Sequence, residues 1–260
     1  MDLGLNGRTA IVTGASRGIG LAIVARLIAE GVRVIGAART VTEELRETGA
    51  AAVAVDLGTP AGAAELVSQA LETLGGVDIL VNNVGGAEFN AINGFLDIDD
   101  ETWRRTLDVN LFSAIRVTRA ALPSLIERHG TVINMSSIVG RAPGAAVADY
   151  GVAKAALTAL SKALAEQFGP QGVRVNTISP GPVRTAFWES PDGPGGKMAA
   201  ANGIGIEDFL PQLPAAVGMT TGRLIEADEI ASQVAFLVSD HARSILGTDL
   251  YIDGGALKTI

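Results

Sequence analysis

The stretch "TAIVTGASRGIG", residues 9–20, decides the fold. Its first part is β-branched and apolar at nearly every position, as in a strand that is buried on both faces of a sheet. Glycines follow at positions 14, 18 and 20, and they lead directly into an alanine-rich segment of helical period. Glycine lets the backbone turn sharply, and the N-terminus of a helix presents free N–H groups and a partial positive charge. The stretch therefore predicts a strand, a tight turn and a helix start that could hold a phosphate, although an ordinary glycine-rich turn has a similar composition.

The same alternation continues along the whole chain. Apolar runs occupy residues 9–14, 32–38, 51–56, 77–83, 130–137, 173–181 and 248–255. Segments of helical period occupy about residues 18–30, 42–49, 60–74, 101–128, 149–168 and 227–239. Strands that alternate with helices need right-handed crossovers and form a parallel sheet. The pattern predicts a doubly wound α/β fold with seven parallel strands, in which ligands bind beyond the carboxyl ends of the strands.

Composition limits the class of protein. The 260 residues are 48% hydrophobic and 18% charged, without a low-complexity linker, so we expect a single domain over residues 1–260. A net charge of −8 with no lysine–arginine run argues against a nucleic-acid partner. The start of the chain lacks a signal-like segment, and no run of about 18 apolar residues could span a membrane. We therefore expect a cytoplasmic protein with no membrane contact.

Metal and thiol chemistry are disfavoured by the residue types present. The chain has no cysteine, which excludes disulfides, thiolate nucleophiles and sulfur-ligated metals. Its two histidines, His129 and His241, lie far apart in sequence and have no partner at ligand spacing. We interpret both as helix-end residues and predict no metal site.

The segment "ADYGVAKAAL", residues 148–157, contains one of only two tyrosines. A lysine follows four positions later, about one helical turn, so Tyr150 and Lys154 share a helix face. A positive charge near a phenol favours the phenolate, which would bring the pKa of the tyrosine from about 10 towards neutral pH. The pair is a candidate for acid–base chemistry, although this spacing also occurs by chance on many helices.

Taken together, the motifs resemble those of the short-chain dehydrogenase/reductase family. The glycine spacing in residues 13–20 matches TGxxxGxG of that family and not the GxGxxG fingerprint. "LVNNVGG" is similar to the family's NNAG motif, with Val84 in place of alanine, and "LDVN" places an asparagine where the family keeps one in its active site. "INMSSIVG" places a serine thirteen residues before the tyrosine, and "SPGPVRT" and "IDGG" resemble the family's later motifs. The resemblance covers about residues 7–255 and implies a Rossmann-type fold.

The resemblance implies a catalytic tetrad of Asn110, Ser137, Tyr150 and Lys154. By analogy, Tyr150 is the general acid in carbonyl reduction and the general base in the reverse direction. Lys154 lowers the pKa of the phenol and hydrogen-bonds the nicotinamide ribose, while Ser137 hydrogen-bonds the substrate oxygen. Asn110 holds a water that links Lys154 to bulk solvent. Ser136 is the less favoured of the two adjacent serines.

The resemblance also implies a dinucleotide cofactor at the strand ends. The expected cofactor residues are Gly14, Ser16, Arg17, Gly18, Ile19, Gly20, Arg39, Asp56, Leu57, Asn83, Gly85, Tyr150, Lys154, Pro180, Gly181, Val183 and Thr185. An NAD-specific enzyme usually ends its second strand with a carboxylate that binds the ribose 2′-OH, whereas this strand ends with Ala38 and Arg39. Arg17 adds a second guanidinium group in the glycine loop, although either arginine could be a solvated surface charge. We predict NADP(H).

A long, broken segment precedes the last helix and strand. Six of the ten prolines and eight glycines fall between residues 180 and 222, too many for a simple connection. In the family this segment is a lid over the substrate, here about residues 182–225. The expected substrate pocket comprises Phe89, Val139, Phe187, Trp188 and Phe209. These side chains suggest a hydrophobic ketone or its secondary alcohol as substrate. Arg141 and Arg184 could instead bind a substrate that carries a carboxylate.

The sequence is also compatible with two other functions, and it predicts an oligomeric assembly. A reductase of 3-oxoacyl chains on an acidic carrier protein would need basic residues at the site mouth, where only scattered ones such as Arg128 and Arg141 are expected. A catalytically silent dinucleotide-binding regulator could share the fold. The helices over residues 101–128 and 149–168 resemble the pair through which family members dimerise, so we expect a homo-oligomer, a tetramer, acting on a small molecule. The alanines of these helices would equally suit packing on their own sheet.

Overall fold

The seven predicted strands form one parallel sheet in a computed structural model that describes residues 2–87, 95–144 and 147–258. The strands lie in the order β3-β2-β1-β4-β5-β6-β9, which confirms the doubly wound, Rossmann-type α/β fold. Their bounds are β1 Thr9–Thr13, β2 Arg33–Ala38, β3 Ala51–Ala54, β4 Ile79–Asn82, β5 Thr131–Met135, β6 Arg174–Pro180 and β9 Asp249–Ile252. The order reverses between β1 and β4, where folds of this kind bind their ligands.

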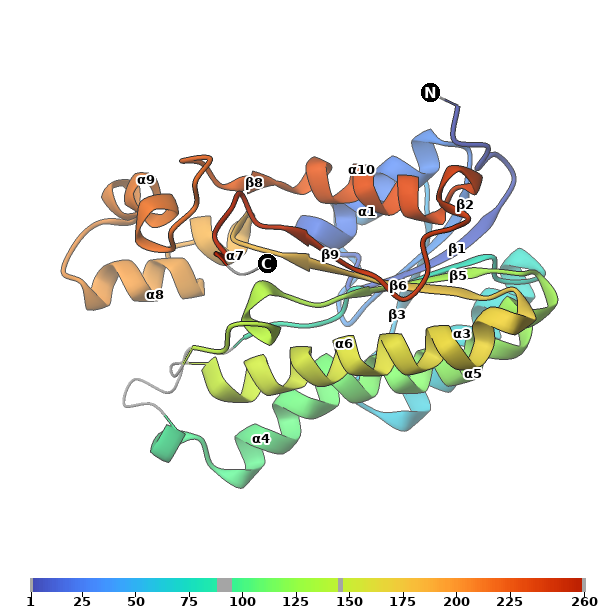
Figure 1. Ribbon diagram of the computed structural model, residues 1–260, viewed down its shortest axis with the longest axis horizontal. Coiled ribbons are helices and arrows are strands. Elements are labelled where there is room, and N and C mark those ends of the chain that lie inside the picture. Colours follow the sequence, from blue (N-terminus) through green and yellow to red (C-terminus); the bar gives the residue numbers. More distant parts are fainter. Residues whose placement is uncertain (1, 88–94, 145–146, 259–260) are drawn as a thin grey trace.

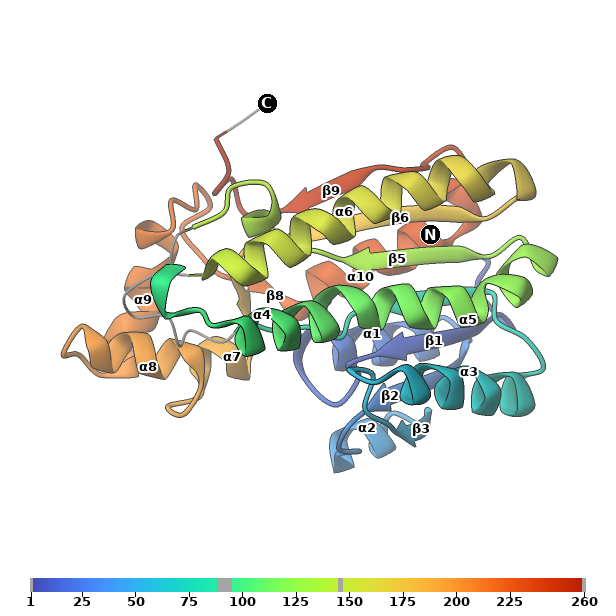
Figure 2. The ribbon, with the colours of Figure 1, turned by 90° about the horizontal axis from the view of Figure 1, so that it is seen from below.

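Helices cover both faces of the sheet (Figure 1). On one face lie α1 and α10, and on the other lie α3, α5 and α6, as the second view also shows (Figure 2). The main helices are α1 Gly18–Ala29, α2 Glu43–Glu47, α3 Pro60–Leu74, α4 Asp100–Leu107, α5 Ser113–Glu127, α6 Ala148–Phe168 and α10 Ala227–Val238. Short 3-10 turns are η1 Phe95–Asp97, η3 Ile138–Gly140, η5 Gly169–Gln171 and η6 Asp240–Ala242.

The sheet lies between two hydrophobic cores, and β1 contributes to both. All five of its residues are buried. Ala10 and Val12 pack in the core that contains α1 and α10, while Ile11 packs in the core that contains α3 and α5. Successive side chains of a strand point to opposite faces, so a run that is apolar at every position suits a sheet covered on both sides.

The helix predicted over residues 101–128 differs from expectation. It is divided into α4 and α5 by η2, a π-helical segment over Asp108–Phe112. The hydroxyl of Ser113, the first residue of α5, donates to the Val109 carbonyl of the π segment at 2.6 Å. A π segment inserts an extra residue into a helical turn and often marks a functional position. Hydrophobic periodicity alone did not indicate this insertion.

The broken segment after β6 folds into three helices beyond one end of the sheet (Figure 1). These helices are α7 Ala186–Glu189, α8 Pro194–Ala201 and α9 Ile206–Ala216. A separate two-stranded sheet of β7 Val183–Arg184 and β8 Ile225–Glu226 joins the start and the end of the segment. The segment therefore begins and ends at the same small sheet.

The described residues include neither a membrane-spanning helix nor a cluster of metal-binding side chains. None of the helices there is long and apolar enough to cross a membrane. Among the same residues, no group of three or more acidic or histidine side chains is placed to hold a metal ion.

Candidate active site

The glycine loop after β1 forms a narrow turn because glycine is required at three of its positions. Gly14 and Gly18 have positive φ angles of 67° and 57°, a region that other residues rarely adopt. A Cβ atom on Gly20 would lie 2.1 Å from the Gly14 carbonyl oxygen, so the first turn of α1 can pack against the loop only with glycine there. The start of α1 is thereby held directly at the carboxyl end of β1.

The N-terminus of α1 offers an anion-binding position. Its N-cap residue is Arg17, which is extended and exposed, and no side chain caps the helix. The first N–H groups of a helix have no partner inside the helix, and the helix dipole adds a partial positive charge there. Ser16, Gly18 and Ile19 line the same turn and are partly exposed. The twelve-residue helix α1 thus begins at a turn that is suited to a phosphate group.

Asn83 fixes the loop after β4 against the glycine loop. Its side-chain amide donates to the carbonyls of Thr13 and Gly14, at 3.0 and 3.1 Å. The Thr13 hydroxyl in turn accepts from the backbone N–H groups of Asn83 and Val84. These contacts bridge β1 and β4 at the point where the strand order reverses. Val84, the departure from the family's alanine, is partly buried against the core beneath it.

The loop after β6 forms a second wall beside the glycine loop. A Cβ atom on Gly18 would lie 3.2 Å from the Thr185 methyl group, so these two loops are in contact. Gly181 packs against the turn after β9, where a Cβ atom would lie 3.0 Å from the Cα of Asp253. Pro180 and Val183 are buried in the same loop. The structure therefore brings two of the predicted cofactor segments together.

Arg39 and Arg17 are both exposed near the ends of β2 and β1. Neither guanidinium group has an ion-pair partner among the described residues, while the nearby Glu43 carboxylate pairs with Arg46 at 3.2 Å. Ala38, which takes the place of the usual carboxylate, is buried. The end of β2 thus presents an unpaired positive charge.

The end of β3 contributes two further predicted cofactor residues. Asp56 is exposed, and its carboxylate accepts from the Gly58 N–H at 2.9 Å in a tight turn. Leu57 is 3% exposed and packs in the core. Any contact that Leu57 makes with a ligand would therefore come from its backbone.

Tyr150 and Lys154 lie one turn apart on α6, as the sequence predicted. The Lys154 Nζ is 5.6 Å from the centre of the tyrosine ring, and the phenol is hydrogen-bonded to the Ser137 side chain. Gly140 lets the turn after Ser137 pack against α6, since a Cβ atom there would lie 3.0 Å from the backbone at Lys154. Three of the four predicted catalytic residues therefore meet at the carboxyl end of β5.

The direction of the tyrosine shift differs from our expectation. Burial raises the pKa of Tyr150 to about 12, and the hydrogen bond to Ser137 offsets part of that rise. Burial also lowers the pKa of Lys154 to about 8. The lysine Nζ donates to the Met135 carbonyl at 2.8 Å and does not bond the phenol. Desolvation therefore outweighs the lowering expected from the ammonium group.

Asn110 joins this group from the π segment. Its side-chain amide donates to the carbonyls of Gly86 and Thr106, both at 3.0 Å, and its oxygen accepts from the Gly86 N–H at 2.9 Å. A Cβ atom on Gly85 would lie 2.7 Å from the Asn110 Oδ1 and 2.9 Å from the Lys154 Nζ. Only glycine fits between them. Because the Asn110 side chain is committed to these backbone groups, its expected role in holding a water stays a prediction.

Ser136 has a role that the sequence did not reveal. It is 5% exposed, and its hydroxyl donates to the Lys154 carbonyl at 3.0 Å and accepts from Thr158 at 2.9 Å. Ser136 thus holds the backbone of α6, while its neighbour Ser137 contacts the tyrosine. The sequence does not indicate that the first of the two adjacent serines bonds the backbone of α6. Their different contacts become visible only once the end of β5 packs against α6.

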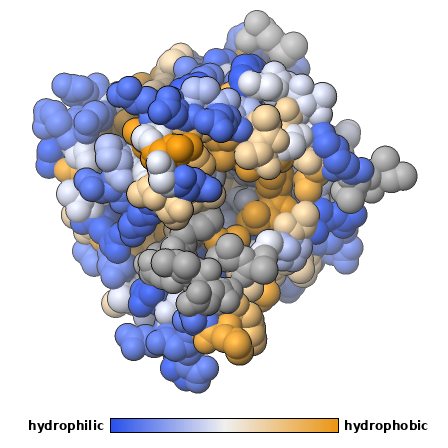
Figure 3. Space-filling model, turned by 90° about the vertical axis from the view of Figure 1, so that its left-hand side faces the viewer, coloured by the Kyte–Doolittle hydropathy of each residue, from blue (hydrophilic) through white to orange (hydrophobic). Residues whose placement is uncertain are grey.

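The expected substrate residues fall into three groups. Val139, Phe187 and Trp188 are partly buried, and the two aromatic rings meet edge to face at 5.1 Å. Phe209 is 8% exposed and lies in the core cluster that also contains Leu213, which favours a packing role for it. Phe89 lies outside the described residues. Figure 3 shows hydrophobic side chains gathered beside a hollow on this face of the molecule.

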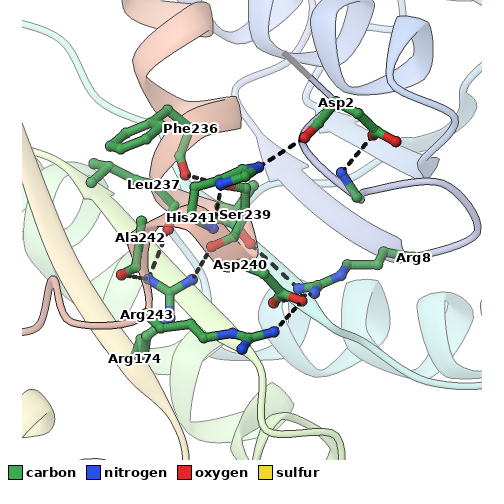
Figure 4. Close-up of polar contacts among 12 residues, drawn as sticks. Asp2, Arg8, Arg174, Phe236, Leu237, Ser239, Asp240, His241, Ala242 and Arg243 are labelled. Carbon is green, nitrogen blue, oxygen red and sulfur yellow. Dashed lines mark hydrogen bonds and ion pairs between the residues drawn. The ribbon is translucent and has the colours of Figure 1, made fainter.

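A cleft of about 560 Å³ opens at the opposite end of the sheet, where the strands begin. Four arginines border it: Arg8, Arg128, Arg174 and Arg243. Figure 4 shows Arg8 and Arg243 paired with Asp240, and Arg174 bonded to carbonyl groups at the end of α10. Arg128 pairs with Asp78 at 2.9 Å. The helix ends converging here carry partial negative charge, so these arginines serve as caps and ion-pair partners. Arg128 is therefore not at the mouth of the tyrosine site.

Comparison with known proteins matches this geometry to one family. A family model described as enoyl-(acyl carrier protein) reductase matches residues 14–256. The 3-oxoacyl-[acyl-carrier-protein] reductase FabG of Escherichia coli (strain K12) is 36% identical over 259 residues, which cover 97% of this chain and 98% of that protein. The 2,3-dihydroxy-2,3-dihydro-p-cumate dehydrogenase of Pseudomonas putida is 35% identical, covering 98% and 96%. L-sorbose reductase from Gluconobacter frateurii, solved with NADPH and L-sorbose, has a TM-score of 0.91 at 32% identity and full coverage of both chains.

Proposed function

The chain belongs to the short-chain dehydrogenase/reductase family of oxidoreductases, and we propose that it interconverts a hydrophobic ketone and its secondary alcohol with NADP(H). The observation that carries this proposal is the meeting of Ser137, Tyr150 and Lys154 at the carboxyl end of β5. The uncapped start of α1 lies at the end of β1 in the same sheet. Together they supply a proton donor and a phosphate position.

The residues present fit a nicotinamide dinucleotide. Because Gly14, Gly18 and Gly20 have no Cβ atom, the backbone of the glycine loop can approach a pyrophosphate closely. Thr185 borders the same loop from the segment after β6. The bound cofactor would supply or accept the hydride. The protein's part is to hold the phosphates, orient the ring and provide the proton.

NADP(H) is proposed over NAD(H) because of charge at the end of β2. Arg39 is exposed and without an ion-pair partner in the described residues, and no carboxylate is present to bind a ribose 2′-OH. A planar guanidinium group suits a 2′-phosphate, and Arg17 is available from the glycine loop. The L-sorbose reductase structure, which contains NADPH, supports this choice by likeness alone.

Proton transfer is assigned to Tyr150. Its high pKa keeps the phenol protonated at neutral pH, the state needed to donate to a carbonyl oxygen during reduction. Ser137, which bonds the phenol, would donate to the same oxygen and stabilise the charge that develops there. Lys154 is buried between the Met135 carbonyl and Gly85, and we assign it to the cofactor ribose by family analogy.

The substrate class rests on the segment after β6. Phe187, Trp188 and Val139 are partly buried apolar side chains of the expected pocket. The named relatives act on an acyl group, a dihydrodiol and a sugar, so their names favour no single class. Reduction of a 3-oxoacyl group on a carrier protein is the second candidate, because the relative of that name is 36% identical over nearly the whole chain.

A substrate panel with both reduced cofactors tests these proposals. The panel compares bulky apolar ketones, small charged keto acids and a 3-oxoacyl carrier protein, with oxidation of the cofactor as readout. The Tyr150→Phe variant is expected to lose at least about 100-fold in turnover, the usual scale of positioned acid–base catalysis, and to bind NADPH as wild type does. Turnover that survives this change would assign the proton to another group. A wild-type protein that binds NADPH but turns over no substrate would favour the silent regulator.

The Arg39→Ala variant tests the cofactor choice. We expect its kcat/KM to fall for NADPH and to stay the same for NADH, with Arg46→Ala as the matched surface control. Equal losses for the two cofactors would contradict the assignment. A homotetramer and a cytoplasmic location complete the proposal.

A further inference from the structure

Asp149, the residue before the tyrosine, is a buried carboxylate that the mechanism above leaves unused. It is 4% exposed and lies in the first turn of α6. Its Oδ2 accepts a hydrogen bond from the Thr106 hydroxyl, in the last turn of α4, at 2.6 Å. A buried carboxylate is costly unless a hydrogen-bond donor satisfies it. The Thr106 hydroxyl is such a donor, and its hydrogen bond links α4 to α6.

Asp149 lies at an end of α6 that lacks a side-chain cap. The N-cap residue, Val147, makes no side-chain hydrogen bond to the helix, and Asp149 is the acidic residue of the first turn. A negative charge is favourable near the N-terminus of a helix. The contact with Thr106 therefore restrains the turn that carries Tyr150.

From Thr106 the hydrogen bonds continue into the active site. The Thr106 carbonyl accepts from the Asn110 amide at 3.0 Å, and the same amide is bonded to Gly86. Gly86 follows Gly85, which separates Asn110 from the Lys154 ammonium group. One unbroken series of contacts thus connects the start of α6 with the turn after β4.

Consecutive residues of a helix point about 100° apart. Asp149 faces α4, and Tyr150 faces the site with Ser137. We infer that Asp149 and Thr106 form a positioning pair. Their hydrogen bond holds the Tyr150 hydroxyl in its orientation and the Asn110 side chain in its position. This inference rests on the proposed oxidoreductase function and adds two residues that act through the catalytic ones.

Four variants and one control test the pair. Asp149→Ala and Thr106→Val each remove the hydrogen bond, whereas Asp149→Asn keeps the acceptor and Thr106→Ser keeps the donor. The control is Asp78→Ala, because the Asp78 carboxylate also accepts a threonine hydroxyl, that of Thr9 at 2.8 Å, but at the amino end of the sheet. Measurements are kcat, KM, NADPH affinity and Tm.

We expect Asp149→Ala and Thr106→Val to lower kcat by up to about 100-fold, since misplacement by about 1 Å can cost that much. NADPH affinity should stay at the wild-type value. The double variant should be no slower than the slower single one, because both changes remove the same contact. Asp149→Asn and Thr106→Ser should recover most of kcat, and Asp78→Ala should lower Tm and leave kcat unchanged.

A second readout does not depend on turnover. Loosening the start of α6 should expose the phenol and lower the pKa of Tyr150 from its raised value. Ultraviolet titration measures this pKa. The Tyr150→Phe variant contains only Tyr251, so subtracting its titration curve isolates the signal of Tyr150. Wild-type kcat and an unshifted titration in Asp149→Ala would overturn the inference, as would an equal loss of kcat in Asp78→Ala. If wild-type protein turns over nothing on the panel, the proposed function fails, and the titration alone decides whether the pair positions the tyrosine.

Discussion

Replacing Lys154 with methionine is expected to change how stability depends on pH. Lys154 is 2% exposed, and burial lowers its pKa from 10.5 to about 8. Below pH 8 the ammonium group is charged in both the folded and the unfolded chain, so the folded state bears the whole cost of burying the charge. Each pKa unit corresponds to about 1.4 kcal/mol, which makes this cost about 3 kcal/mol.

The cost disappears as pH rises. Between pH 8 and 10.5 the unfolded chain holds the lysine proton more tightly than the folded chain, so the stability of wild type rises with pH in that window. The methionine variant lacks this dependence. It also lacks the hydrogen bond from the Lys154 Nζ to the Met135 carbonyl, which contributes about 0.5 to 1.5 kcal/mol when the amine is neutral. The variant should therefore exceed wild type in stability at pH 7 and lose most of that advantage by pH 10.

Thermal unfolding of the cofactor-free proteins at several pH values measures the effect. A free-energy change of 1 kcal/mol shifts Tm by about 2 to 4 °C in a domain near this size, so the difference between variant and wild type should change by about 5 to 10 °C from pH 7 to pH 10. Lys162→Met is the control, because Lys162 lies on the same helix with its side chain 60% exposed. A difference in Tm between Lys154→Met and wild type that is the same at pH 7 and pH 10 would refute the reasoning.

Further predictions concern the tyrosine, the pocket, the glycine loop and the assembly. Because burial raises the pKa of Tyr150 to about 12, ketone reduction should be insensitive to pH between about 6 and 9, while alcohol oxidation, which needs the phenolate, should rise with pH. An oxidation rate that falls over this range would contradict the assignment. Trp188→Ala should raise KM for bulky apolar ketones far more than for small ones, and a preference for small charged keto acids would overturn the pocket. Gly20→Ala should lower stability by about 1 to 3 kcal/mol and weaken NADPH binding, because the new methyl group would meet the Gly14 carbonyl, and wild-type Tm and affinity would count against this packing. Light scattering at micromolar concentration should give the mass of four chains, and the mass of one chain would exclude the tetramer.

Sequence reasoning was strongest where a residue type serves a local backbone need. The glycines at 14, 18 and 20 predicted a tight turn, and the structure shows positive φ angles or close contacts at each. It was weaker where a residue acts across the fold. Ser136, which bonds the Lys154 carbonyl, gave no local signal.

The sequence by itself determined the order of strands and helices, the doubly wound sheet and the spacing of Tyr150 and Lys154. These depend on periodicity and on short-range geometry, which the chain carries in consecutive residues. Only the tertiary structure decided the π segment at Asn110, the hydrogen bond between Asp149 and Thr106, and the direction of the tyrosine pKa. Each of these depends on what surrounds a side chain after packing. Burial is a property of the assembled layers, so desolvation could outweigh a charge that the sequence placed only one turn away.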